Sequence, residues 1–293
     1  HAEQTARVMM GFDDVCREGK PDYVIVVGDV NSTIACALTS VKLGIRTAHV
    51  ESGLRSFDRA MPEEINRLAT DAIVDDLFVT EPSGVANLLH DGVDASRIHH
   101  VGNTMIDSLH FALPMAERST ILNDLELQRG AYALVTLHRP SNVDVPARLA
   151  MLMTVLGDIA RRQRIVFPVH PRTRKNLSAW AIPTPANVTL IDPVGYIDFL
   201  ALMRSASLTL TDSGGIQEET TALGIPCVTA RTTTERPITV DLGTNVLVDP
   251  EPEPMLAAVH AILDGGGKQG SVPELWDGRA SERIVDVLVR HYS

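Results

Sequence analysis

The chain has 293 residues, which exceeds the usual size of one domain and favours two. Its 26 Lys and Arg against 37 Asp and Glu give a net charge of -11, which disfavours nucleic acid or an anionic membrane surface as a partner. The 3 cysteines lack the spacing of a zinc site or disulfide framework, and neither a membrane-spanning run nor a signal peptide is visible, so we expect a cytoplasmic protein.

Short apolar runs alternate with helical patterns along the first half, as in parallel α/β proteins. Four buried strands are predicted there, at 23–28, 46–50, 76–80 and 98–101. The opening residues resemble the middle of a helix and have no Met before them. Because this half has fewer predicted strands than the second, we expect that strand-helix units of roughly 60 residues are missing from its front.

A polar, weakly patterned stretch at 118–128 is the predicted domain junction. Six further strands are predicted after it, at 133–137, 165–168, 188–191, 208–211, 226–229 and 245–247. The tail is predicted to be one helix, because Ile284, Val287 and Leu288 share one helical face. We therefore predict an N-terminal domain over 1–117, a C-terminal domain over 118–275 and a terminal helix over 276–293 that packs back on the first domain.

A Gly-rich turn follows the predicted strand at 208–211 and opens a helix. Ser213, Gly214 and Gly215 let a ligand approach the backbone where a helix start favours negative charge, so the turn predicts a phosphate site. Glu219, further along the helix, is suited to sugar hydroxyls rather than to phosphate. A purely structural turn is the alternative.

Polar side chains are dense after the predicted strands, where ligands bind in open parallel sheets. They are Asp29, Glu51, Arg55, Glu63, Arg67, His138, Arg139 and His170. A cluster of Asp29, Glu51 and Glu63 at one rim would raise carboxyl pKa values and supply groups that give and take protons. Taken singly, each residue also fits a helix cap, an ion pair or a buried histidine. A metal site is disfavoured, because neither His-x-x-x-His nor Asp-x-Asp spacing occurs among these residues.

Two later loops add candidate nucleotide contacts. Arg236 follows the strand at 226–229 and is placed for a charge-assisted contact with phosphate. Tyr196 and Phe199 follow the strand at 188–191 and are candidate stacking partners for a base. Core packing explains Phe199 equally well.

Eight motifs together resemble bacterial non-hydrolysing UDP-N-acetylglucosamine 2-epimerases. They occur in the family's order at 28–29, 49–55, 62–67, 101–104, 136–139, 168–171, 212–219 and 233–237. The resemblance implies α/β architecture of the glycosyltransferase-B type, with two Rossmann-like parallel-sheet domains facing a cleft, the first lacking its N-terminal strand-helix units. It also implies a homodimer and reversible C2 epimerisation of UDP-N-acetylglucosamine to UDP-N-acetylmannosamine. UDP leaves to give 2-acetamidoglucal and adds back, without NAD or an essential metal.

The same resemblance implies roles for single residues. Asp29, Glu51 and Glu63 match the catalytic carboxylates, and His138 matches the active-site histidine that stabilises the departing diphosphate. The turn at 213–215 matches the phosphate site, Glu219 the ribose carboxylate, and Arg236 an arginine on the nucleotide or sugar. The family's Gly-Thr-Arg-Pro-Glu turn is not in this sequence. This makes a UDP-sugar-binding fragment without catalysis one alternative. A hydrolysing relative and a glycosyltransferase of the same architecture are two others.

Overall fold

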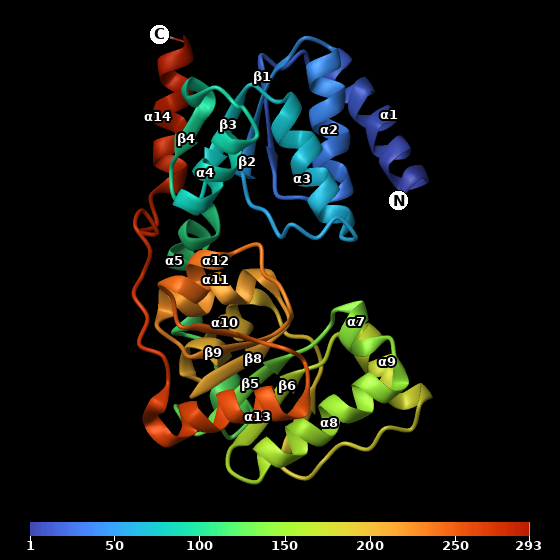
Figure 1. Ribbon diagram of the computed structural model, residues 1–293, viewed down its shortest axis with the longest axis vertical. Coiled ribbons are helices and arrows are strands. Elements are labelled where there is room, and N and C mark those ends of the chain that lie inside the picture. The colour runs from blue at the N-terminus through green and yellow to red at the C-terminus, as the bar shows by residue number, and fades with distance from the viewer. Residues whose placement is uncertain (293) are drawn as a thin grey trace. The chain divides into compact units, whose positions relative to one another are not determined.

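A computed structural model describes residues 1–292 and divides into two compact units, each with its own parallel sheet (Figure 1). Unit 1 combines residues 1–107 with the chain from Glu274 onward, and unit 2 comprises Ser108–Pro273. The fold class predicted from the sequence, two parallel-sheet α/β domains, is confirmed. The divisions fall at Asp107/Ser108 and Pro273/Glu274 rather than at 117/118 and 275/276, because helix α5 (Thr104–Ala116) runs through the first of them.

Unit 1 contains a four-stranded sheet in the order β1-β2-β3-β4. Its strands are β1 (Tyr23–Val27), β2 (Arg46–Ser52), β3 (Asp76–Val79) and β4 (Ile98–His100). Its helices are α1 (Ala2–Gly19), α2 (Asn31–Lys42), α3 (Pro62–Ile73), α4 (Pro82–His90), the 3-10 helix η1 (Ala95–Arg97) and α14 (Ala280–Tyr292). Val27 pairs with Val50, so the loops after β1 and β2 leave the sheet at the same edge.

The sheet of unit 1 has an apolar cluster on each face. One cluster contains Val24, Val26, Leu77, Val79 and Leu88. On the other face Ala48, Val50 and Phe78 pack with Ile284 of α14, and Val287 and Leu288 lie against them. Burial on two faces explains why β3 is almost entirely apolar and why the side chains of β2 from Thr47 to Val50 are all buried.

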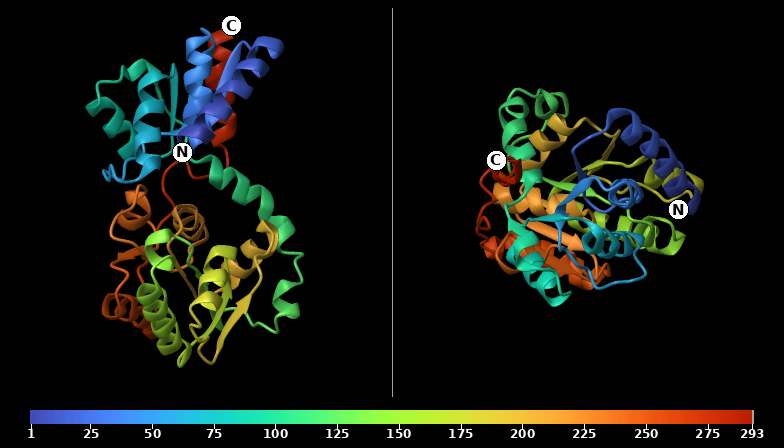
Figure 2. Two further views of the ribbon diagram at one scale, coloured as in Figure 1. Left: turned by 90° about the vertical axis from the view of Figure 1, so that its right-hand side faces the viewer. Right: turned by 90° about the horizontal axis from the view of Figure 1, so that it is seen from above.

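Unit 2 contains a six-stranded sheet in the order β10-β9-β8-β5-β6-β7, with helices on both sides (Figure 2). Its strands are β5 (Tyr132–Thr136), β6 (Arg164–Pro168), β7 (Val188–Ile191), β8 (Leu208–Thr211), β9 (Cys227–Ala230) and β10 (Asn245–Val248). Its helices are α6 (Ile121–Asp124), α7 (Pro140–Val143), α8 (Pro146–Ala160), α9 (Pro171–Ala179), α10 (Tyr196–Ser205), α11 (Gly214–Leu223), α12 (Pro237–Asp241), α13 (Pro252–Ala261) and the π-helix η2 (Ile262–Gly266).

The strand order of unit 2 reverses between β5 and β8. Thr136 pairs with Thr211, so the chain leaves both strands side by side before turning to opposite flanks of the sheet. Ligands of open parallel sheets bind outside the carboxyl ends of the strands at such a switch point. The loops that begin at Leu137 and Asp212 are therefore the first place to look for a site.

Three further observations concern the cysteines, the helices and the metal-ligating side chains. Cys16, Cys36 and Cys227 are all free thiols. Within residues 1–292, no helix combines the length and the apolar character needed to cross a bilayer. Nor do three His, Cys, Asp or Glu side chains of the described residues gather into a group that could hold a metal ion.

Candidate functional site

A cavity of about 260 Å³ opens at the switch point of unit 2. It is lined by Thr136, Leu137, His138, Pro168, His170, Pro193, Val194, Phe199, Ser213 and Ile216. Four of the predicted site residues, His138, His170, Phe199 and Ser213, thus come together from the ends of three strands and from α10. The apolar remainder of the wall suits the face of a base or sugar.

The Gly-rich turn brings a hydroxyl and a helix start to this cavity. Ser213 is the N-cap of α11, and its backbone N–H donates to the Thr211 hydroxyl at 2.9 Å. Gly214 and Gly215 are the first residues of the helix. A Cβ at Gly214 would lie 2.6 Å from the Arg236 guanidinium and 2.8 Å from the Glu235 carboxylate, so a larger residue there would displace this ion pair. The first N–H groups of α11 remain available to an anion.

Arg236 lies beneath this turn between two carboxylates. Its Nε is 2.8 Å from Glu218, and its Nη1 donates to Glu235. Glu235 also accepts from Arg231 at 2.9 Å. Burial raises the pKa of Glu235, but the charges of Arg236 and Arg231 outweigh it and lower that pKa to about 2. The arginine is thereby held in place, with 9% of its surface exposed.

Glu219 lies further along α11 and is 5% exposed. Burial raises its pKa to about 7, the neighbouring charge of Glu218 adds to this, and a hydrogen bond from Tyr196 works against it. The Tyr196 hydroxyl donates to Oε1 of Glu219 at 2.8 Å. Tyr196 therefore contacts the predicted ribose carboxylate, whereas Phe199 lines the cavity itself.

His138 and Arg139 are bound to Asp212, which directly follows β8. Nδ1 of His138 is 2.9 Å from the Asp212 carboxylate, and Nε of Arg139 donates to the Asp212 carbonyl at 2.9 Å. The His138 ring is 6.0 Å from the ring of His170, which caps α9 by accepting the Arg172 N–H at 3.2 Å. Asp212 begins one of the predicted motifs, but its sequence context predicted no role for it. The feature of the sequence that could have indicated a role for Asp212 is that this acid and His138 each follow a predicted strand.

The three predicted catalytic carboxylates belong to unit 1. Asp29 follows β1, and Glu51 lies at a bulge of β2 with φ of +69°, a left-handed conformation that costs a non-glycine residue about 1 kcal/mol. Glu63 is in the first turn of α3, and no hydrogen bond or ion pair of its side chain occurs within residues 1–292. The Asn66 amide donates to the Asp29 carbonyl at 2.8 Å, which ties α3 to the loop after β1.

Two predicted binding arginines, Arg55 and Arg67, are engaged inside unit 1. Arg55 is 5% exposed and spans Asp71 at 2.7 Å and Asp91 at 3.0 Å. Arg67 is 2% exposed and donates to Asp29 and, at 2.6 Å, to Glu64. The structure thus places both where they fix the loops that carry the carboxylates.

Behind these loops lies a buried histidine that was not among the predicted site residues. His49 of β2 is fully buried, with Nδ1 2.6 Å from the Asp71 carboxylate and Nε2 2.8 Å from the Gly28 carbonyl. It therefore connects the end of β1, just before Asp29, to α3. Its place inside an apolar strand gave no signal beyond that of an ordinary core histidine.

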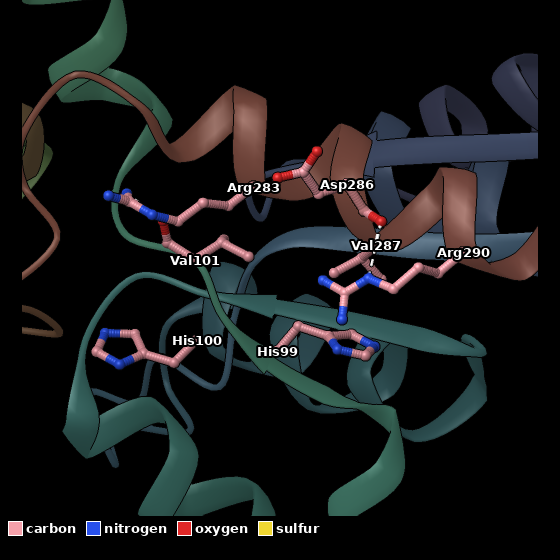
Figure 3. Close-up of a pocket in the computed structure, with 7 residues that line it drawn as sticks. All are labelled: His99, His100, Val101, Arg283, Asp286, Val287 and Arg290. Carbon is pink, nitrogen blue, oxygen red and sulfur yellow. Dashed lines mark hydrogen bonds between the residues drawn. The ribbon is translucent and has the colours of Figure 1, made fainter.

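A larger cavity of about 430 Å³ lies between β4 and α14 (Figure 3). Figure 3 shows Arg290 above the ring of His99, with Val287 between α14 and the strand. Arg283, at the other end, donates to Asp277 and to the Val101 carbonyl. None of the predicted site residues lines this cavity, so the smaller cavity of unit 2 is the candidate site.

Comparison with known proteins gives consistent matches. The family profile described as UDP-N-acetylglucosamine 2-epimerase matches residues 1–289. The UDP-N-acetylglucosamine 2-epimerase of Methanococcus maripaludis is 39% identical over 98% of this chain and 81% of its own length. A UDP-2,3-diacetamido-2,3-dideoxy-D-glucuronate 2-epimerase of Pseudomonas aeruginosa is 40% identical, over 99% and 81%. The crystal structure of Methanocaldococcus jannaschii UDP-GlcNAc 2-epimerase in complex with UDP-GlcNAc and UDP has a TM-score of 0.90 at 40% identity, covering 99% of this chain and 82% of that chain.

Proposed function

Because the chain belongs to the UDP-N-acetylglucosamine 2-epimerase family, we propose that it interconverts UDP-N-acetylglucosamine and UDP-N-acetylmannosamine by inverting C2. One observation carries this assignment most directly. Helix α11 presents the Ser213-Gly214 turn at its start and the buried Glu219 further along, beside a cavity lined by His138 and Phe199. That arrangement offers a diphosphate and a ribose their contacts on one helix.

We propose that unit 2 binds the UDP part of the substrate. Ser213 and the N–H groups of Gly214 and Gly215 take the diphosphate, and Arg236 adds positive charge beneath them. Glu219 accepts hydrogen bonds from the ribose hydroxyls, and Phe199 packs against the base. His170 completes the cavity wall on the side of β6, and Arg139, held on the Asp212 carbonyl, adds positive charge near the phosphate turn. These assignments follow the placement of each group around the cavity and its chemistry.

The carboxylates of unit 1 are proposed to handle the protons of the reaction. A base removes the proton from C2 while the C1–O bond breaks, and UDP departs with the bonding electrons to leave 2-acetamidoglucal. A proton then returns to the opposite face of C2 as UDP adds back to C1. Asp29, Glu51 and Glu63 divide these transfers, with Arg67 and Arg55 holding their loops. His138 stabilises the charge on the departing diphosphate.

The experiment that tests the proposal is incubation of the protein with UDP-N-acetylglucosamine. We expect an equilibrium mixture of two UDP-sugars, which proton NMR detects. In deuterated water, the hydrogen on C2 of both sugars should exchange for deuterium. Free N-acetylmannosamine with UDP would instead identify a hydrolysing enzyme. The Pseudomonas aeruginosa relative makes UDP-2,3-diacetamido-2,3-dideoxy-glucuronate the second candidate substrate, and a parallel incubation decides between the two.

Three further properties are part of the proposal. The protein acts in the cytoplasm, in keeping with its free thiols. It functions as a homodimer, as the family resemblance implies. It needs neither NAD nor a metal, because elimination and re-addition require only proton transfer and charge stabilisation. Turnover that is unchanged by a metal chelator, and the mass of the protein in solution, check the last two points.

A further inference from the structure

The Asp212 carboxylate is fully buried, and the polar groups of the described residues that contact it are donors. It accepts the backbone N–H of His138 at 3.1 Å, the backbone N–H of Arg139 at 3.0 Å and the Asn142 amide at 3.0 Å. The remaining contact is Nδ1 of His138, at 2.9 Å. Burial raises the pKa of Asp212, but the bonds from His138, Asn142 and Arg139 outweigh it and lower the pKa below its ordinary value.

The ionisation of Asp212 fixes the hydrogen on one nitrogen of His138. An ionised carboxylate is only an acceptor, so the hydrogen of the 2.9 Å contact belongs to Nδ1. The nitrogen that remains for a ligand is Nε2. The ring is 43% exposed and lines the same cavity as Ser213, so that nitrogen is accessible beside the phosphate turn.

We propose that Asp212 is a positioning residue for His138. It keeps the hydrogen on Nδ1, orients the ring in the cavity wall and stabilises the imidazolium when Nε2 donates a hydrogen bond to the diphosphate of a bound nucleotide. The inference rests on the proposed function, because that function assigns a diphosphate to this cavity. It adds a residue that acts through His138 rather than on the substrate.

A purely structural role is the competing explanation. Three of the four contacts fix the loop after β5 and would form whatever side chain stood at position 138. The two explanations differ in the size of the effect on nucleotide binding and in the state of the ring. If Asp212 only fixed the loop, replacing it by Asn would weaken UDP binding no more than the loss of another contact of that loop, and the hydrogen of His138 would stay on the same nitrogen. If it supports the imidazolium, the same replacement weakens binding further and moves that hydrogen.

The first test uses the unmodified chain without ligand. Long-range ¹H–¹⁵N NMR of the histidine rings, assigned with His138→Gln, identifies the protonated nitrogen of the neutral ring. We expect the hydrogen of His138 on Nδ1 and a bare Nε2. A hydrogen on Nε2 would overturn the proposal, and this readout depends neither on turnover nor on any Asp212 variant.

The second test compares Asp212→Asn with Asn142→Leu by calorimetric titration with UDP. Asn142 bonds the same carboxylate without touching the imidazole, so its replacement loosens the loop alone. We expect Asp212→Asn to weaken UDP binding about tenfold or more and to move the His138 hydrogen to Nε2, and Asn142→Leu to change affinity less than about threefold. Equal losses with an unchanged ring, or tighter binding by Asp212→Asn, would contradict the proposal. Failure of the unmodified chain to bind UDP, with Nδ1 protonated, would instead contradict the proposed function.

Discussion

At the scale of single residues, Glu219 is a buried carboxylic acid that changes its charge near neutral pH. Its pKa is raised to about 7, mainly by burial. Hydroxyl donors of a ribose favour the ionised form, so nucleoside binding and loss of a proton are linked. Affinity for the ribose should therefore be weak below pH about 7, where the carboxyl is protonated, and should increase as pH rises through that value.

We predict that uridine affinity increases between pH about 6 and about 8 and is level above it. Uridine is the appropriate probe because it lacks the phosphates that His138 and Arg236 would bind. NMR titration at several pH values provides the measurement. Glu219→Gln keeps the shape of the side chain but cannot titrate, so its profile should be flat. A flat profile in the unmodified protein would contradict the linkage.

The same shift affects stability with the opposite sign. The folded state holds the Glu219 proton up to pH about 7, whereas the unfolded state releases it near the ordinary glutamate value. The stabilisation from this group is therefore complete at low pH and is lost as pH rises through about 7. Glu219→Gln should remove this component of the pH dependence.

The carboxylates of unit 1 provide the second prediction at this scale. Asp29→Asn, Glu51→Gln and Glu63→Gln should each lower turnover by at least about 10²-fold, because each removes a group proposed to move a proton. UDP affinity should stay the same, since the proposed UDP contacts belong to unit 2. Glu18→Gln, on the exposed side of α1, is the matched control. Ordinary turnover in all three site variants would refute the assignment.

Sequence motifs predicted candidate site residues but not the bonds between them. Asp212 and His138 lie 74 positions apart, and their contact depends on β8 lying next to β5. The spacing of residues along the sequence does not predict which strands are neighbours in the sheet. The pairing of Arg67 with Asp29 has the same character, because it requires α3 to pack against the loop after β1.

At the scale of elements, all ten strands were predictable within two residues, because most of them are short runs rich in β-branched and aliphatic residues. The short helices α6, α7 and α12 were not predicted. A helix of a single turn has too few residues to show the hydrophobic period of about 3.6 residues that predicts helices. The domain junction was also displaced, since α5 continues a regular helical pattern across the division between the units.

The end of β2 gives a prediction about backbone geometry. Gly53 has φ of +78°, and a Cβ there would lie 2.4 Å from the Gly84 carbonyl at the start of α4. Gly53→Ala should reduce the free energy of unfolding by roughly 3 kcal/mol or more, through both strain and collision. Gly28→Ala, at φ of +71° with nothing within 4 Å, should cost only about 1–2 kcal/mol.

Urea denaturation of unit 1 measures this difference. Trp276 is 2% exposed and donates to the Thr80 carbonyl at 3.0 Å, so its fluorescence reports the folding of unit 1. Both glycine variants are made in a Trp180→Phe background, which removes the signal of unit 2. Equal losses in the free energy of unfolding for the Gly53 and Gly28 variants would show that the close approach of Gly53 to Gly84 does not affect stability.

At the scale of the whole molecule, the chain carries two tryptophans, one in each unit. Trp180 packs against the core of unit 2, and Trp276 lies in unit 1. We predict that UDP at about 100 times its dissociation constant stabilises unit 2 by roughly 2.7 kcal/mol. The unfolding midpoint followed through Trp180, in a Trp276→Phe background, should rise accordingly. No rise at Trp180 would contradict the placement of the UDP contacts in unit 2.

The return of the chain to unit 1 affects how unit 1 folds while the ribosome synthesises the protein. Every residue of unit 2 is synthesised before α14, whose Ile284, Val287 and Leu288 cover Ala48, Val50 and Phe78. The part made first is therefore the part completed last, and its apolar face stays open throughout elongation. Nascent chains stalled before α14 should expose that face to chaperones and to one another. Translation speed over the last helix thus becomes a determinant of yield.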